Sequence, residues 1–155
     1  MEHNTSEVLD SVIQLPCSHI LPHAGHSSGT ETEDHFIVRE GMVYAGSHII
    51  LDLWGARHLD DLDIMEQAMR EVVNVSGATL LHIHLHHFTP SGGISGVAVL
   101  AESHISVHTW PERDFAAFDV FMCGDAKPEM SIPVLKQYFF PQRMEVTEQL
   151  RGTVR

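Results

Sequence analysis

Cysteine, basic residues and long apolar runs are all scarce in this 155-residue sequence. Its two cysteines, Cys17 and Cys123, are too few for a disulfide framework, which predicts a reducing, cytoplasmic setting. Nine Lys and Arg residues against 21 Asp and Glu residues leave a net charge of −12, which disfavours nucleic acid and anionic membranes as partners. No run approaches the roughly 20 apolar residues that span a bilayer, and no basic segment opens the chain as in a signal peptide.

Several common functional motifs are also missing. The sequence contains no G-x-G-x-x-G, Walker A or C-x-x-C pattern, so nothing indicates a dinucleotide site, a P-loop or a redox pair. The stretch Gly93–Val97 begins like a nucleophile elbow but has valine where the final glycine belongs, which argues against a hydrolase triad.

The N-terminal part differs in composition from the rest of the chain. Its first 40 residues carry seven acidic residues and a single basic one, with few apolar positions. This composition predicts a flexible, acidic, His-rich extension over residues 1–46, followed by one folded domain over residues 47–152. The histidines at His19, His23 and His26 are expected to be solvated rather than bound to metal.

Hydrophobic periodicity predicts the elements of the folded domain. A first strand is expected from Ser47 to Gly55, and a helix that begins at Asp60 or Asp61 and stops at Gly77. Because strands outnumber helices and neighbouring strands resemble hairpins, we expect an α+β fold, a two-layer sandwich of a mainly antiparallel sheet with two helices on one face. The further predicted elements are strands over 78–88, 97–102, 105–109, 115–122 and 143–150, and a helix over 130–139.

The second predicted strand carries a ladder of histidines, His82, His84 and His86, which alternates with apolar residues beginning at Leu81. Such a ladder resembles a zinc or non-haem metal site. However, no Asp, Glu or Cys lies nearby in the sequence to complete one. We therefore expect no metal, and a polar sheet face that is solvated or packed against a second subunit, with Leu81 pointing to the opposite side.

The remaining candidates for chemistry are Ser95, Ser103, His108, Glu112 and Cys123. Each has an ordinary structural explanation when taken singly, such as a turn cap, a core histidine or a small buried thiol. The Glu-Ser-His step that includes Ser103 is less ordinary, because it joins two apolar strands without any glycine or proline.

The string E-S-H-I-S-V-H-T-W-P-E over residues 102–112 closely resembles the short prokaryotic S-adenosylmethionine decarboxylase proenzymes, which are pyruvoyl enzymes. Ser95 lies eight residues before Ser103, and Cys123 twenty residues after it, as in that family. The resemblance covers about residues 47–152. It implies that Ser103 Oγ attacks the carbonyl of Glu102, and that the chain splits into a β chain, 1–102, and an α chain, 103–155, which begins with a pyruvoyl group derived from Ser103.

The resemblance also implies a role for each candidate. Ser95 and His108 would assist the self-cleavage. The pyruvoyl group at position 103 would form a Schiff base with the substrate amine, and Cys123 would protonate the substrate carbon after CO₂ leaves. The residues implied to bind substrate are Phe88 at the adenine, Glu112 at the ribose hydroxyls and Trp54 as a second aromatic wall.

The resemblance implies S-adenosylmethionine as substrate, a product that donates the aminopropyl group in spermidine synthesis, and a homodimer of αβ units that pairs the bare sheet faces. One alternative is a pyruvoyl decarboxylase of the same fold that acts on arginine or ornithine. A less favoured one is a non-catalytic, His-rich metal-binding or regulatory protein.

Overall fold

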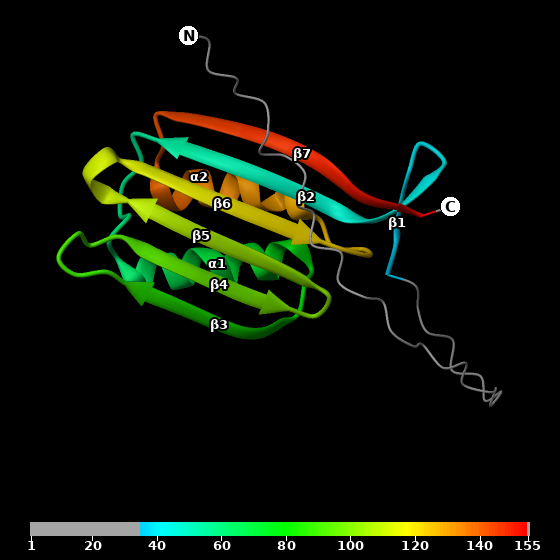
Figure 1. Cartoon of the computed structure of the whole chain (residues 1–155), viewed down its shortest axis with the longest axis horizontal. Helices are drawn as coiled ribbons and strands as arrows, with labels where there is room; N and C mark the ends of the chain where they lie inside the picture. Colours follow the sequence, from blue (N-terminus) through cyan, green and yellow to red (C-terminus); the bar gives the residue numbers. More distant parts are fainter. Residues whose placement is uncertain (1–34, 155) are drawn as a thin grey trace, which may run out of the picture. The chain divides into compact units, whose positions relative to one another are not determined.

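The computed structural model describes residues 35–154, in which a seven-stranded sheet is backed by two helices (Figure 1). The strands follow the order β7-β2-β6-β5-β4-β3, with β1 paired to the start of β2. Every pairing is antiparallel, which confirms the predicted fold class. The strands are β1 (Ile37–Arg39), β2 (Met42–Trp54), β3 (Leu80–His87), β4 (Ile94–Leu100), β5 (Ser103–Trp110), β6 (Phe115–Met122) and β7 (Arg143–Val154).

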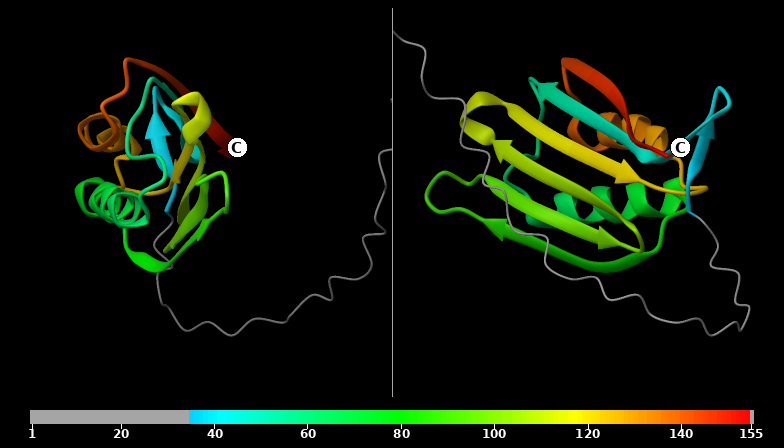
Figure 2. Two further views of the ribbon diagram at one scale, coloured as in Figure 1. Left: turned by 90° about the vertical axis from the view of Figure 1, so that its left-hand side faces the viewer. Right: turned by 45° about the vertical axis from the view of Figure 1, so that its right-hand side comes forward.

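Both helices, α1 (Leu62–Ser76) and α2 (Ser131–Phe139), cover the same face of the sheet (Figure 2). The period-two pattern of the strands directs one set of side chains to these helices, and the burial of alternate residues in β6 follows it. The core lies between the two layers and leaves the other face of the sheet open. Its largest fully buried side chains include Leu51, Leu53, Met65, Met69, Phe118, Leu135 and Phe139.

The first helix has the ends that its sequence predicts. The side chain of Asp61, rather than that of Asp60, accepts a hydrogen bond from the backbone N–H of Ile64 at 3.0 Å. Gly77 ends the helix with φ +73°, in the left-handed region that favours glycine. Local chemistry therefore fixes both ends of α1.

The predicted start of the first strand at Ser47 is wrong, because β2 begins at Met42. Its early residues pair with β1 and with the end of β7, which runs to Val154 rather than to residue 150. The predicted boundary between residues 46 and 47 therefore falls within a strand. Residues 1–34, with Cys17, His19, His23 and His26 of the predicted extension, lie outside the described residues.

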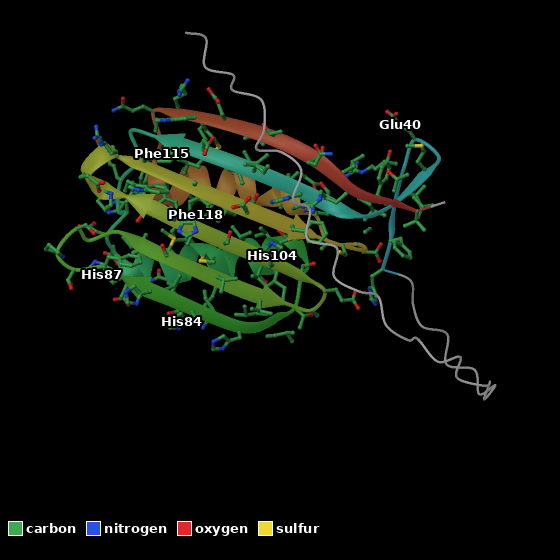
Figure 3. The ribbon with its side chains drawn as sticks, viewed as in Figure 1. Glu40, His84, His87, His104, Phe115 and Phe118 are labelled. Carbon is green, nitrogen blue, oxygen red and sulfur yellow. The ribbon has the colours of Figure 1, made fainter. Side chains whose placement is uncertain are left out.

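The histidine ladder lies on the edge strand β3, where His82, His84 and His86 are exposed and pair with Val99, Val97 and Ser95 of β4. Figure 3 labels His84 on this strand. Leu81, predicted to point to the opposite side, is not buried in the core; its exposed fraction is 64%. The cause is an irregularity in the β3–β4 register between Leu80 and His82, which breaks the simple alternation of faces.

Candidate active site

The Glu102–Ser103 step lies at the tip of a tight hairpin. Leu100 pairs with Ser103, so only Ala101 and Glu102 connect β4 to β5. Glu102 has φ +66°, a backbone conformation that is uncommon for residues other than glycine. The backbone is therefore strained at this turn, and the strain falls on the residue whose carbonyl group Ser103 would attack.

Ser103 and Cys123 lie together beside this turn, although they are twenty residues apart in the sequence. The backbone N–H of Cys123 donates a hydrogen bond to Ser103 Oγ at 3.2 Å. Partial burial raises the pKa of the Cys123 thiol, and the nearby Glu102 carboxylate raises it further, whereas a hydrogen bond between the thiol and the Ser103 side chain lowers it. The net increase favours a protonated thiol at neutral pH.

A second group of predicted residues surrounds a cavity of about 250 Å³ at the other end of the hairpin. Ser95 and His108 face each other across β4 and β5, with Ser95 Oγ and His108 Nδ1 2.8 Å apart. Phe88, just after β3, and Glu112, in the 3₁₀ turn Pro111–Arg113, line the same cavity. The fold thus brings together four candidates that come from four separate elements or turns.

The two groups are far apart within one chain. His108 lies five residues beyond Ser103 on β5, which corresponds to about 16 Å at the usual rise per strand residue. A hydrogen bond spans about 3 Å. In a single chain, the Ser95–His108 pair therefore cannot contact the Glu102–Ser103 bond.

Trp54 does not line the cavity. Its ring packs against Phe115 with centroids 5.5 Å apart, and the guanidinium carbon of Arg143 lies 3.7 Å from its ring centroid. Phe115 in turn packs against Trp110, which does line the cavity. Trp54 therefore touches the site only through a row of aromatic rings.

The loop between β3 and β4 shapes one wall of the cavity. The N–H of Phe88 donates to the carbonyl of Gly93 at 2.8 Å, and the N–H of Gly92 donates back to the carbonyl of Phe88 at 2.8 Å. A Cβ atom at Gly93 would lie 2.8 Å from the carbonyl oxygen of Thr109, closer than such atoms approach. Only glycine lets this loop lie so close to β5.

Thr109 is a residue that sequence reasoning missed. Its buried hydroxyl donates to the carbonyl of Leu59 at 2.7 Å and accepts from the N–H of Ile94 at 2.7 Å. It joins the end of β5 to the loop before α1 and to the start of β4, and so fixes the backbone next to His108. No local signal reveals it, because its partners are 50 and 15 residues away.

The open face between the two groups carries a polar network that sequence reasoning also missed. Asp119 on β6 lies 3.1 Å from His48 Nε2 and accepts a hydrogen bond from Ser106 Oγ at 3.2 Å. His104 packs on the ring of Phe121, with centroids 5.6 Å apart (Figure 3).

Within residues 35–154, no three His, Cys, Asp or Glu side chains are placed to hold a metal ion together. This includes the histidine ladder on β3. Among the helices of that same region, none has the length and apolarity needed to cross a membrane.

We predict that Thr109→Val lowers the free energy of unfolding by about 1–3 kcal/mol, because the N–H of Ile94 and the carbonyl of Leu59 lose their buried partner. Urea denaturation followed by fluorescence measures the change. The control is Thr147→Val on the edge strand β7, where the exposed side chain makes no hydrogen bond to any described residue. Equal stability of the two variants would contradict the bridging role.

Comparisons with known proteins identify the family of the chain. The model of the S-adenosylmethionine decarboxylase family matches residues 47–152. An S-adenosylmethionine decarboxylase proenzyme from Thermomicrobium roseum is 47% identical over 110 residues, covering 70% of this chain and 95% of that protein. One from Methanococcus maripaludis is 47% identical over 116 residues, covering 73% and 94%.

A solved structure supports the same family assignment. The adenosylmethionine decarboxylase from Aquifex aeolicus VF5 matches with a TM-score of 0.67 and 32% identity, covering 72% of this chain and 94% of that one. The sequence resemblance and the matched region coincide, since both cover residues 47–152. The chain therefore belongs to the S-adenosylmethionine decarboxylase family.

Proposed function

We propose that this decarboxylase activates itself by breaking its own Glu102–Ser103 bond and then acts on S-adenosylmethionine with a pyruvoyl group derived from Ser103. The observation that carries the proposal is the turn itself. A strained Glu102 precedes a serine whose Oγ is held by the N–H of Cys123, without glycine or proline to explain the turn. The relatives from Thermomicrobium and Methanococcus are named as proenzymes, which fits self-processing.

The cleavage needs only atoms of the chain and one water molecule. Ser103 Oγ attacks the carbonyl carbon of Glu102, the C–N bond breaks, and an ester with a free Ser103 amine results. A base removes the α-proton of Ser103, and the bond between Cβ and Oγ of Ser103 breaks, so that Oγ leaves as part of the carboxylate of Glu102. The dehydroalanine left at position 103 tautomerises to an imine, and water hydrolyses the imine to a ketone with loss of ammonia.

Residue 103 suits a pyruvoyl group because it begins β5 beside Cys123. Once formed, this group supplies a carbonyl that takes the substrate amine and an amide carbonyl that accepts the electrons released with CO₂. Cys123 then delivers a proton to the substrate carbon. The raised pKa of its thiol keeps that proton available at neutral pH.

The cavity supplies the groups for a nucleoside. Phe88, with an exposed fraction of 45%, offers a ring on which adenine can stack, and the exposed Glu112 offers a carboxylate that can accept the ribose hydroxyl protons. Trp54 does not line the cavity and so would not contact the substrate directly. It would act by supporting Trp110 through the ring of Phe115.

We further propose that two αβ units form a homodimer through their open faces. About 16 Å separates Ser103 from the Ser95–His108 pair along β5. A two-fold pairing of open faces brings the Ser103 end of one copy over the cavity of the other. The cavity of about 250 Å³ is smaller than typical small-molecule sites of about 300–1,000 Å³, as half of a site would be. Apolar side chains stay exposed on this face at Ile50, Val99 and Trp110.

We predict that Ser103→Ala leaves the 17.3 kDa chain intact, whereas Cys123→Ala is cleaved but decarboxylates slowly. The first variant lacks the nucleophile; the second lacks only the proton donor. Denaturing gels and intact mass measure the products, of about 11 and 6 kDa in proportion to the lengths of residues 1–102 and 103–155. Ser106→Ala, on the same strand, is the control and should be cleaved normally. Uncleaved Cys123→Ala would contradict the role of its thiol.

We predict that the processed enzyme releases labelled CO₂ from S-adenosylmethionine and not from arginine or ornithine, because neither amino acid has an adenine or a ribose for the cavity to bind. The three substrates are compared side by side at equal concentration. Phe88→Ala should raise KM for S-adenosylmethionine. Faster release from arginine or ornithine would assign the pyruvoyl chemistry to a basic amino acid instead.

The shared site can be tested by complementation. We predict that Ser103→Ala and Glu112→Gln chains, each nearly inactive alone, recover activity when co-expressed, because a mixed dimer contains one site with both Ser103 and Glu112 intact. That dimer should show roughly half the activity of the wild-type dimer. No recovery in mixed dimers isolated with two different tags would indicate that each site is built within one chain.

A further inference from the structure

We propose that His35 is a positioning residue for self-cleavage, which holds the side chain of Glu102 at the bond to be broken. His35 precedes the region that the family model matches, residues 47–152. The inference rests on the proposed cleavage between Glu102 and Ser103 and adds to it a contact from the N-terminal part of this chain.

The contact is direct. His35 Nδ1 lies 3.1 Å from Glu102 Oε2, and the two side chains have exposed fractions of 51% and 50%. At this distance the protonated imidazole forms an ion pair with the carboxylate. Glu102 is the residue with the strained backbone at the tip of the hairpin.

A backbone hydrogen bond holds His35 in place. The N–H of Gly124 donates to the carbonyl of His35 at 2.7 Å. The preceding N–H, that of Cys123, donates to Ser103 Oγ at 3.2 Å. Two successive N–H groups at the end of β6 therefore hold the two sides of the site, the nucleophile and the segment that carries His35. In Figure 1 this segment leads into β1 beside the end of β6.

The position of His35 suits the first step of the cleavage. Attack by Ser103 Oγ places negative charge on the carbonyl oxygen of Glu102, in the same residue as its carboxylate. A hydrogen-bond donor or positive charge on that carboxylate reduces the repulsion between the two. The contact also limits the conformations of Glu102, so its carbonyl spends more time within reach of Ser103 Oγ.

The contact can also persist after cleavage. His35 and Glu102 both belong to the β chain, residues 1–102, so breaking the bond to Ser103 does not separate them. Cleavage adds a terminal carboxylate to Glu102 and increases the negative charge near the imidazole. His35 would then hold the new end of the β chain away from position 103.

The experiment follows self-cleavage of the full-length chain after pulse labelling, as conversion of the 17.3 kDa band into its two fragments. His35→Asn should slow cleavage by about two- to fivefold, the scale expected for a half-exposed ion pair. His35→Lys, which keeps a cation at this position, should restore the rate to within about twofold of wild type. The matched control is His58→Asn, an exposed histidine that also lies outside β-strands and helices and whose φ of +60° asparagine tolerates.

A double-mutant cycle separates this role from a general loss of structure. In a Glu102→Gln background, His35→Asn should cause no further slowing, because the carboxylate it acts on is gone. In an uncleavable Ser103→Ala background, His35→Asn should leave the midpoint of thermal unfolding unchanged.

The outcomes are distinct. If wild-type chain never cleaves, the proposed function fails, and this inference fails with it. If wild-type chain cleaves but His35→Asn cleaves equally fast, or slows as much beside Glu102→Gln, His35 has no positioning role while the proposed function stands.

Discussion

The register of the β4–β5 hairpin is the constraint on which the rest of the site depends. Pairing Leu100 with Ser103 leaves a two-residue connection and puts Glu102 at φ +66°. The same register places Ser95 opposite His108 at the far end. A slip of one residue would turn each side chain to the other face and would separate both arrangements at once. Gly96 allows the neighbouring β3–β4 pair to pack closely, because a Cβ atom there would lie 2.8 Å from the carbonyl oxygen of His84.

The two-layer architecture explains why the candidate site residues lie in two separate groups, one with Ser103 and one with His108. Two helices are enough to cover one face of the sheet, and a chain of this size leaves the other face open (Figure 2). The open face carries histidines, the Asp119 network and exposed apolar side chains. Such a mixture suits an interface between αβ units better than a permanently solvated surface. The proposed dimer would thereby cover the face and complete the cavity.

The strands that precede and follow the family's core pattern extend the sheet at one end. β1 and the early part of β2 pair with each other, and β7 continues to Val154 beside them. This extension places His35 at the same end as the Glu102 turn. A segment that precedes the matched region can therefore contact the Glu102 turn, because antiparallel strands return the chain to the same end of the sheet.

The sequence by itself determined the elements whose signals are local. Asp61 and Gly77 mark the ends of α1, period-two patterning marks the strands, and the string over residues 102–112 identifies the family. Local interactions are enough to define these elements, since helix capping and strand alternation involve residues only a few positions apart.

Tertiary structure alone decided the features that depend on distant partners. The start of β2 at Met42 depends on pairing with β1 and β7, and the exposure of Leu81 depends on an irregular register with β4. Thr109 bridges residues 15 and 50 positions away. Contacts between distant residues form only when the whole sheet assembles, so no short window of sequence carries their signal.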